Sequence, residues 1–271
     1  MFNSVYILFR HNFSEPEQQK IKTMLTEAFP DIQLLNRPDE KTGLVLCVGG
    51  DGTFLRGVEA RVNKKTPVLG VNVGGHLGYL TSETDFKKAL SYLQSGQYAI
   101  VERTMVAADI SCNGKTNAHI EAINEIVIRG ENNKPIEVDV LISGSIVEDV
   151  FGDGLLISTP AGSTAYNLSA GGPLIDPDCQ NLIITPIAPI DLNFRPVVIP
   201  DNKHILLKFE VRQNEHKYAF ADRQEIVLEK GTYQVEVQKA ATSLRLIEFP
   251  DAKGNFFQIL HERTLGHRSD K

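Results

Sequence analysis

The stretch LVLCVGGDGT, residues 44–53, sets an apolar run directly before a glycine-rich turn. The five apolar residues 44–48 are typical of a buried strand, and residues 54–62 have the spacing of a helix. Glycines let another group approach the backbone closely, but the carboxylate of Asp51 would repel a bare phosphate. Asp51 therefore either stabilises the turn or acts on a group that is delivered to the turn.

The same alternation of strand and helix surrounds this turn. Residues 4–9 and 68–73 are predicted as buried strands, and residues 15–29 and 85–93 as helices. A second glycine cluster, GGHLG, follows the strand at 68–73. Strands that alternate with helices form parallel sheets, whose ligands bind at the carboxyl ends of the strands. The N-terminal part is therefore predicted to be an α/β domain with a site at its glycine clusters.

From about Met105 the pattern changes to strands with few helical stretches between them, which predicts a β-rich second domain. The predicted strands are 107–111, 125–129, 136–143, 155–158, 205–211 and 233–238. Four prolines, Pro186, Pro189, Pro196 and Pro200, favour loops or sheet edges. The apolar tail, with Phe256, Phe257, Ile259 and Leu260, is expected to pack on the first domain. The expected partition is 1–103 plus 249–271 for the α/β domain and 104–248 for the β-rich domain.

Composition limits the classes of function. With 42% hydrophobic and 23% charged residues in 271, the chain is typical of soluble globular proteins. A net charge of −6 without a basic run argues against an extended nucleic-acid interface. The widely spaced Cys47, Cys112 and Cys179 predict neither a disulfide framework nor a metal site and fit a reducing cytoplasm. No apolar run approaches the roughly 18 residues that span a bilayer, so neither a signal peptide nor a membrane anchor is expected.

Metal ligation by the protein alone is not expected, since the seven histidines show no HxxxH or HExxH spacing. Any metal ion should arrive with a phosphate ligand. The dipeptide Gly114-Lys115 is not part of a P-loop, because Asp109 occupies the position of the required upstream glycine. A hairpin turn is expected there.

A second motif, FGDGLLISTPAGSTAYNLSAGGP at 151–173, is crowded with small residues that would make a poor core. Residues 162–165 allow a planar ligand to approach the backbone, Tyr166 offers an aromatic edge, and Asp153 offers a carboxylate to a hydroxyl or amino group. The structural interpretation of the same residues, a tight turn leading to a helix near Thr164, is compatible with a binding site and does not oppose it.

Two shorter polar groups carry less information. Asn124-Glu125 precedes the apolar residues 126–128, and alone it favours a polar pair on an edge strand. Asp222-Arg223-Gln224 lies between two apolar triplets, which predicts a hairpin turn. By themselves the residues promote neither group to a site.

Taken together, these stretches resemble the NAD kinase family. The resemblance rests on GGDGT, GVNVGGHLGYLT at 70–81, AINEIVI at 122–128, the motif at 152–173 and RPVVIP at 195–200, in this order. GGDGT alone is shared with lipid kinases and resembles the phosphofructokinase loop. The resemblance implies a Rossmann-like nucleotide-binding domain, an all-β second domain for NAD binding and oligomerisation, and a C-terminal segment that returns to the first. It also implies transfer of the terminal phosphoryl of ATP, or in some members polyphosphate, to the 2′-hydroxyl of the adenosine ribose of NAD.

The resemblance further implies roles for individual residues. Asp51 would be the general base, and the phosphate loop would be Gly49, Gly50, Gly52 and Thr53, with Gly52 and Asp51 also near the substrate. Asn124 and Glu125 would bind the adenosine and ribose, and Asp153 another polar group of the dinucleotide. The adenine pocket would be Thr164, Ala165, Tyr166, Asn167, Leu168 and Ser169, lined by Ala161 and closed by Gln224. Mg²⁺ or another divalent cation would arrive with the donor.

One position departs from the family pattern. Many relatives carry a basic residue where this chain has Phe151, which leaves the donor range and the choice between NAD and NADH open. Lys134 and Arg223 are candidates to supply the missing charge. The resemblance also implies a homodimer or homotetramer, whereas the cysteines, the net charge and the absence of a long apolar run predict a cytoplasmic protein that binds neither nucleic acid nor membranes. The rival hypotheses are a lipid or sugar kinase with the same loop and a dinucleotide sensor without turnover.

Overall fold

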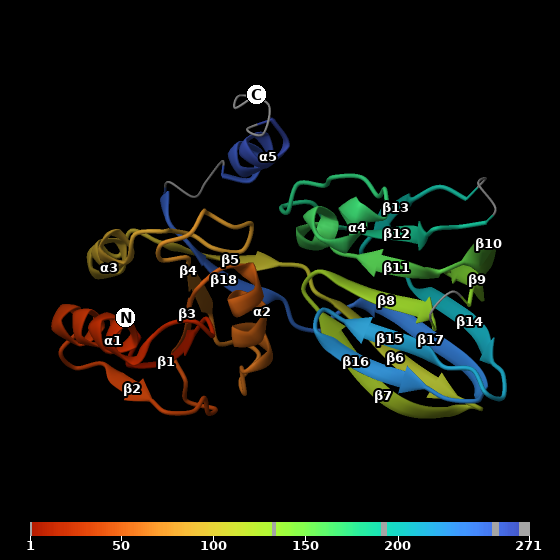
Figure 1. Cartoon of the computed structure of the whole chain (residues 1–271), viewed down its shortest axis with the longest axis horizontal. Coiled ribbons are helices and arrows are strands. Elements are labelled where there is room, and N and C mark those ends of the chain that lie inside the picture. Colours follow the sequence, from red (N-terminus) through yellow and green to blue (C-terminus); the bar gives the residue numbers. More distant parts are fainter. Residues whose placement is uncertain (1, 132–133, 191–193, 251–254, 266–271) are drawn as a thin grey trace. The chain divides into compact units, whose positions relative to one another are not determined.

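The computed structural model describes residues 2–131, 134–190, 194–250 and 255–265. The chain separates into two compact units, Met1–Glu102 with Leu244–Lys271, and Arg103–Ser243. Each unit is built around its own sheet system, and each is described by itself (Figure 1). Among the described residues, no helix combines the length and the apolar character that crossing a bilayer requires.

Unit 1 contains a six-stranded sheet in the order β2-β1-β3-β4-β18-β5. The strands β1, β2, β3, β4 and β18 pair in parallel. The bounds are β1 (Ser4–Phe9), β2 (Gln33–Leu35), β3 (Leu44–Val48), β4 (Val68–Val71), β5 (Ala99–Arg103) and β18 (Leu244–Glu248). The helices are α1 (Glu15–Ala28), α2 (Asp51–Glu59), α3 (Phe86–Ser95) and α5 (Asn255–Leu265). The strands and helices predicted for residues 4–93 are present with shifted bounds: α2 begins and ends three residues earlier than predicted, and β4 ends at Val71 instead of residue 73. The short strand β2 was not predicted.

Helices cover both faces of this sheet, which explains why every residue of β3 is buried. Leu44, Leu46 and Val48 belong to the core cluster that includes residues of α1 and α3. Val45 and Cys47 point to the opposite face, where α2 lies so close that a Cβ at Gly57 would be 2.1 Å from the Cys47 thiol. Alternate residues of one strand therefore serve two apolar layers, and a continuous apolar run results.

The C-terminal boundary differs from the expected one. Residues 244–248 were assigned to the β-rich domain, but they form β18, which pairs in parallel with β4 at Leu246 and Val68. The Ser82 hydroxyl also donates a 2.6 Å hydrogen bond to the carbonyl of Ile247. Local sequence did not reveal this because the partners lie about 165 residues apart. Beyond β18, the ring of Phe256 in α5 lies 6.0 Å from that of Tyr79.

Unit 2 consists of two six-stranded sheets, β10-β9-β14-β17-β6-β7 and β13-β12-β11-β8-β15-β16. The first contains β6 (Val106–Cys112), β7 (Lys115–Ala122), β9 (Ile136–Ile142), β10 (Ser145–Gly152), β14 (Ile205–Val211) and β17 (Gly231–Lys239). The second contains β8 (Glu125–Gly130), β11 (Gly154–Ser158), β12 (Asn181–Ile187), β13 (Val197–Pro200), β15 (Lys217–Ala221) and β16 (Gln224–Leu228). Neighbouring strands are antiparallel, and both sheets contribute to one apolar cluster. The β-rich second domain is confirmed.

Individual expectations for unit 2 had different outcomes. The hairpin turns at Gly114 and at Asp222-Arg223 are confirmed, as connections of β6 to β7 and of β15 to β16. Pro186 was expected in a loop or at an edge, but it lies in β12, an interior strand, opposite Leu155. The strand tolerates this proline because pairing with β13 covers only residues 181–184.

Candidate functional site

The glycine turn after β3 has a geometry that other residues would not adopt. Gly49 has a φ of 153°, and a Cβ there would lie 2.5 Å from the Thr53 hydroxyl and 3.0 Å from the Cβ of Arg10. Gly50 is the N-cap of α2, and its carbonyl accepts the N–H of Thr53 at 2.8 Å. Asp51 and Gly52 are thus the first residues of α2, where free N–H groups and the helix dipole favour an anion.

The second glycine cluster holds the carboxylate of Asp51. The backbone N–H groups of Tyr79 and Leu80 each donate to one of its oxygens at 3.1 Å. Gly78 leaves the space for this contact, since a Cβ there would lie 2.0 Å from Oδ1 of Asp51. The sequence left open whether Asp51 stabilises the turn or acts on a delivered group. The carboxylate of Asp51 has a structural part, because it joins the two glycine clusters. Its remaining lone pairs can still accept a proton or a hydrogen bond from a group delivered to the turn.

Asn72, at the end of β4, joins the two glycine clusters and was not singled out from sequence. Its side-chain amide donates to the backbone carbonyl of His76 at 2.6 Å. The backbone carbonyl of Asn72 accepts the N–H of Gly75 at 3.0 Å. A Cβ at Gly50 would lie 3.4 Å from the same amide nitrogen. Its place in GVNVGG, between a strand and a glycine pair, was the available signal.

In unit 2, Asp222 fixes the backbone at Asn124, and it too was missed. Its carboxylate accepts the N–H groups of Ile123 at 2.7 Å and of Asn124 at 2.8 Å. Its own N–H donates to the carbonyl of Glu125 at 3.2 Å. Asp222 adopts a φ of 49°, which aspartate tolerates better than most residues. The hairpin turn therefore does more than reverse the chain: it supports the start of β8.

Glu125 lies on an interior strand, so the prediction of an edge-strand pair is wrong. β8 runs between β11 and β15, and Glu125 is only 8% exposed. Burial, and secondarily the charge of Asp222, raises the pKa of Glu125 to about 8 against the opposing effect of the Tyr166 N–H. Its Oε2 is buried without a hydrogen-bond partner. An unpartnered buried oxygen is costly unless a ligand or water pairs with it, so Glu125 is a candidate for contact with a ligand.

The shifted pKa predicts how stability depends on pH. Between its unfolded value near 4.5 and its folded value near 8, Glu125 binds more proton in the folded state, so stability falls as pH rises through this window. Glu125→Gln should remove this decline and leave the variant more stable than the parent at pH 9 by on the order of a few kcal/mol. Urea unfolding at pH 5 and pH 9 measures the difference.

The exposed Glu236→Gln, on β17 of the same unit, is the matched control and should leave the pH dependence of unfolding unchanged. Equal pH slopes for Glu125→Gln and the parent protein would contradict the assignment of this titration to Glu125.

The small residues after β11 are required because the chain passes close to Asn124. A Cβ at Gly162 would lie 2.1 Å from the Asn124 carbonyl oxygen, which also accepts the N–H of Thr159 at 2.9 Å. The Thr159 hydroxyl donates to the carbonyl of Ile123 at 2.5 Å and accepts the N–H of Gly162 at 3.1 Å. The turn and the start of β8 are therefore one rigid assembly, followed by the short helices η1 (Ala161–Thr164) and α4 (Tyr166–Ser169).

Within this assembly the predicted adenine-pocket residues divide by exposure. Ala161, Thr164, Ala165 and Tyr166 are half-buried, whereas Leu168 and Ser169 are exposed. Asn167 is fully buried: its amide group donates to the carbonyls of Ser163 and Pro173, and its oxygen accepts the Thr185 hydroxyl at 2.7 Å. The side chain of Asn167 therefore supports the turn.

Other predicted residues lie elsewhere in unit 2. Asp153 precedes β11, whereas Ser158, opposite Glu125, ends it, so the rise of an extended strand separates Asp153 from the Glu125 end by roughly 15 Å. Phe151, on the edge strand β10, is 42% exposed. Gln224 starts β16 beside Ala221, which pairs with Ile126 of β8, and thus lies toward the Glu125 end. The structure brings Gln224, but not Asp153, to that end.

Two family models match the chain: the ATP-NAD kinase N-terminal domain over residues 6–98 and the ATP-NAD kinase C-terminal domain over residues 123–249. The chain is 31% identical to the NAD kinase of Flavobacterium psychrophilum, over 97% of this chain and 94% of the relative. It is 36% identical to that of Ruminiclostridium cellulolyticum, over 84% and 79% of the two chains. The chain belongs to the NAD kinase family. The match of the C-terminal domain excludes a lipid or sugar kinase that shares GGDGT alone.

Solved structures of NAD(H) kinases share the fold. The crystal structure of yeast NADH kinase complexed with NADH superposes with a TM-score of 0.82 at 23% identity, covering 99% of this chain and 89% of the other. The NAD kinase from Archaeoglobus fulgidus in complex with ATP gives a TM-score of 0.73 at 23% identity, covering 94% and 97%. Across the part of this NAD kinase family member that the structure describes, no group of three or more His, Cys, Asp or Glu side chains is arranged to hold a metal ion.

Proposed function

We propose that this member of the NAD kinase family transfers the terminal phosphoryl of ATP to the 2′-hydroxyl of the adenosine ribose of NAD, with Asp51 as the general base. The observation that carries the proposal is the placement of the Asp51 carboxylate. It stands at the N-terminus of α2, beside Gly49 and Gly50, and is held by the N–H groups of Tyr79 and Leu80. A fixed carboxylate at this position can accept the proton that the hydroxyl loses as it attacks.

The Rossmann-like unit 1 supplies the phosphate loop as well as the base. Gly49, Gly50 and Gly52 leave the backbone accessible, and the N-terminus of α2 favours the negative phosphates. Phosphoryl transfer passes through a loose transition state, so positioning and charge neutralisation are the main tasks of the protein. Mg²⁺ or another divalent cation would neutralise the donor. A lone carboxylate beside a glycine loop fits an ion that is held largely by phosphate oxygens.

Unit 2 supplies contacts for the acceptor. Glu125 offers its unpartnered Oε2 to a ribose hydroxyl or an amino group, and Asp222 holds Asn124 in place beside it. Ala161, Thr164, Ala165 and Tyr166 provide a backbone surface for the adenine, which Leu168, Ser169 and Gln224 border. Asn167 acts by supporting this surface. Asp153 would bind a different part of the dinucleotide, since it lies at the other end of β11.

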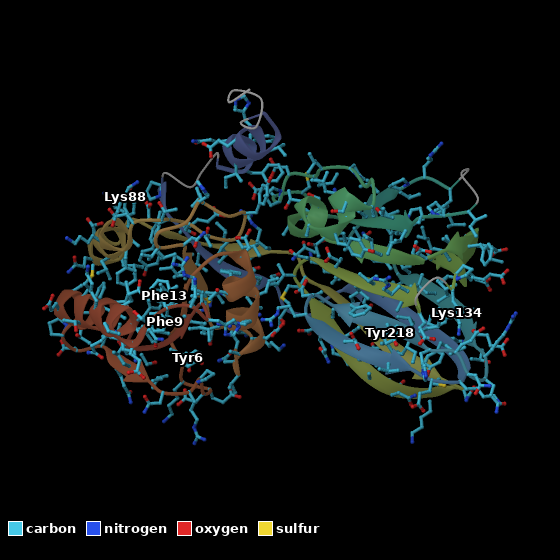
Figure 2. All side chains as sticks on the ribbon, in the orientation of Figure 1. Tyr6, Phe9, Phe13, Lys88, Lys134 and Tyr218 are labelled. Carbon is cyan, nitrogen blue, oxygen red and sulfur yellow. The ribbon has the colours of Figure 1, made fainter. Side chains whose placement is uncertain are left out.

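Phe151 stands where many relatives carry a basic residue, and no other residue has been assigned to supply that positive charge. Lys134, labelled in Figure 2, lies 3.6 Å from the carboxylate of Glu131, and Arg223 is exposed in the β15–β16 turn. Their roles stay predictions, as do assembly into a homodimer or homotetramer and residence in the cytoplasm.

The assay that tests the proposal uses the purified full chain with Mg²⁺ and four substrate pairs. ATP or polyphosphate is combined with NAD or NADH, and NADP or NADPH is measured with a dehydrogenase specific for the phosphorylated cofactor. We expect NADP from ATP and NAD. Binding of NAD without product from any of the four pairs would reject the kinase and leave a dinucleotide sensor.

A further inference from the structure

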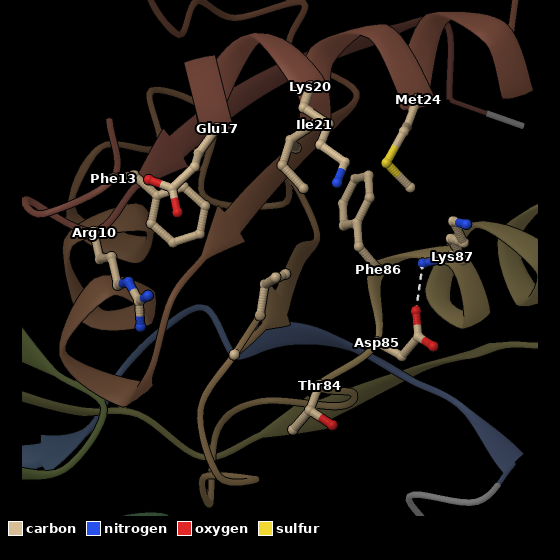
Figure 3. Close-up of a pocket in the computed structure, with 12 residues that line it drawn as sticks. Arg10, Phe13, Glu17, Lys20, Ile21, Met24, Thr84, Asp85, Phe86 and Lys87 are labelled. Carbon is tan, nitrogen blue, oxygen red and sulfur yellow. Dashed lines mark hydrogen bonds between the residues drawn. The ribbon is translucent and has the colours of Figure 1, made fainter. Parts of the chain in front are cut away.

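A cavity in unit 1 has no part in the proposed acceptor chemistry. It has a volume of about 580 Å³ and lies between α1 and the residues that lead into α3. Figure 3 shows the side chains of Lys20, Ile21 and Met24 extending from α1 toward Phe86. A volume of this size is within the usual range of small-molecule sites.

The walls of this pocket combine apolar and cationic groups. Phe13, Ile21, Met24 and Phe86 form an apolar surface, and Phe13 packs against Phe9 with ring centroids 5.7 Å apart (Figure 2). Three cations, Arg10, Lys20 and Lys87, also line the pocket, and they outnumber the two carboxylates there, Glu17 and Asp85, by one. Asp85 accepts the backbone N–H of Lys87 at 2.8 Å and so caps α3. An apolar surface beside clustered cations suits a flat ring that carries an anionic chain.

Among the three cations, Arg10 has a buried side-chain N–H group that lacks a hydrogen-bond acceptor. Its guanidinium carbon lies over the Phe13 ring, 4.7 Å from the ring centroid, so the cation is next to the apolar wall of the pocket. Its Nε is buried without a hydrogen-bond partner. A buried N–H of this kind is stabilised when an acceptor, such as a phosphate oxygen, enters the site.

At two places, residues that line the pocket lie next to the phosphate loop or to a residue that contacts it. On one side, the N–H of Arg10 donates to the carbonyl of Val48 at 3.0 Å, and a Cβ at Gly49 would lie 3.0 Å from the Cβ of Arg10. On the other side, Gly74 lines the pocket and precedes Gly75, which contacts Asn72. Asn72 in turn adjoins Gly50. Arg10 therefore adjoins Gly49, and Gly74 is linked through Gly75 and Asn72 to Gly50.

We propose that this pocket binds the nucleoside of the phosphate donor, with its phosphates extending past Arg10 to the glycine loop. The inference rests on the proposed function, because it names the donor of that reaction. The ring packs on the apolar wall, and the phosphates occupy the cationic border. A nucleoside triphosphate uses both parts of the site, whereas polyphosphate uses the second alone.

The test fills the pocket and measures binding without turnover. Met24→Trp places a large ring in the apolar wall, and Thr23→Trp, at the exposed preceding position outside the wall, is the matched control. Calorimetry on the full chain measures the affinity for ADP and for inorganic tripolyphosphate in the absence of NAD. Met24→Trp should lower the affinity for ADP about tenfold, which is the effect of losing roughly 50 Å² of apolar contact. The affinity for tripolyphosphate should stay within about twofold of the parent value. Thr23→Trp should change neither affinity.

A second variant keeps the proposal testable if Met24→Trp does not fold. Lys20→Glu reverses a charge in the pocket. It should lower the affinity for ADP about three- to tenfold at low salt and by a smaller factor at high salt. Lys115→Glu, on β7, is its control. Unchanged ADP affinity in a folded Met24→Trp or in Lys20→Glu would overturn the proposal, and so would an equal loss of tripolyphosphate affinity in Met24→Trp.

These outcomes are separate from a failure of the proposed function. If the parent protein forms no NADP but Met24→Trp still weakens ADP selectively, the pocket is a nucleoside site and the kinase assignment fails. If the parent protein forms NADP, and if Met24→Trp leaves the affinity for ADP unchanged, the kinase assignment stands and the pocket proposal fails.

Discussion

Asp51→Asn is expected to fold, to bind NAD and to form NADP on the order of 10² to 10⁴ times more slowly than the parent protein. An amide lacks the basicity to take the proton of the 2′-hydroxyl, so the turnover number should fall. Its oxygen can still accept one of the two N–H groups that hold the carboxylate, those of Tyr79 and Leu80. The loop should therefore stay in place. Initial rates at saturating ATP and NAD, with NAD affinity measured separately, give the result.

A matched control separates loss of the base from loss of a turn. Asp39→Asn changes another carboxylate of unit 1 that accepts a backbone N–H, that of Lys41 at 2.9 Å. Its turnover number should equal that of the parent protein. A turnover number near the parent value in folded Asp51→Asn would reject Asp51 as the base.

Gly78→Ala is expected to lower the turnover number by about 10²-fold or more although it removes no reacting group, because a misplacement of the order of 1 Å can have this effect. The added Cβ would lie 2.0 Å from Oδ1 and 2.7 Å from Cγ of Asp51, so the carboxylate or the loop at 74–81 must move. Gly78 is buried, and its N–H is fixed by the Thr81 hydroxyl at 2.7 Å. Displacement of Asp51 should dominate over a general loss of stability.

The control for Gly78→Ala is an equally crowded glycine away from this loop. A Cβ at Gly231 would lie 2.3 Å from the Cys112 thiol, so Gly231→Ala overpacks unit 2 without reaching Asp51. We expect Gly231→Ala to lower the melting temperature and to leave the turnover number near the parent value. If the two variants lose activity in proportion to their loss of stability, Gly78 does not act through Asp51.

The predictions made from local patterns were correct where one segment carries its own signal. The apolar run 44–48 became the buried strand β3, and GGDGT became the turn into α2. The turns at Gly114 and Asp222 also follow from local chemistry. Strands such as β7 and β12 were missed because pairing across a sheet, and not propensity, stabilises them.

The sequence by itself determined the α/β and β-rich parts, the strand-turn-helix at Asp51 and, through its motifs, the NAD kinase family. These properties depend on hydrophobic periodicity and on glycine positions within a few residues. The tertiary structure alone decided that Gly78 makes room for the Asp51 carboxylate, that β18 joins the first sheet, and that Glu125 is buried. It also decided that Asp222 holds Asn124 across 98 residues of chain. Such contacts depend on which distant backbone atoms meet, and no local periodicity encodes that.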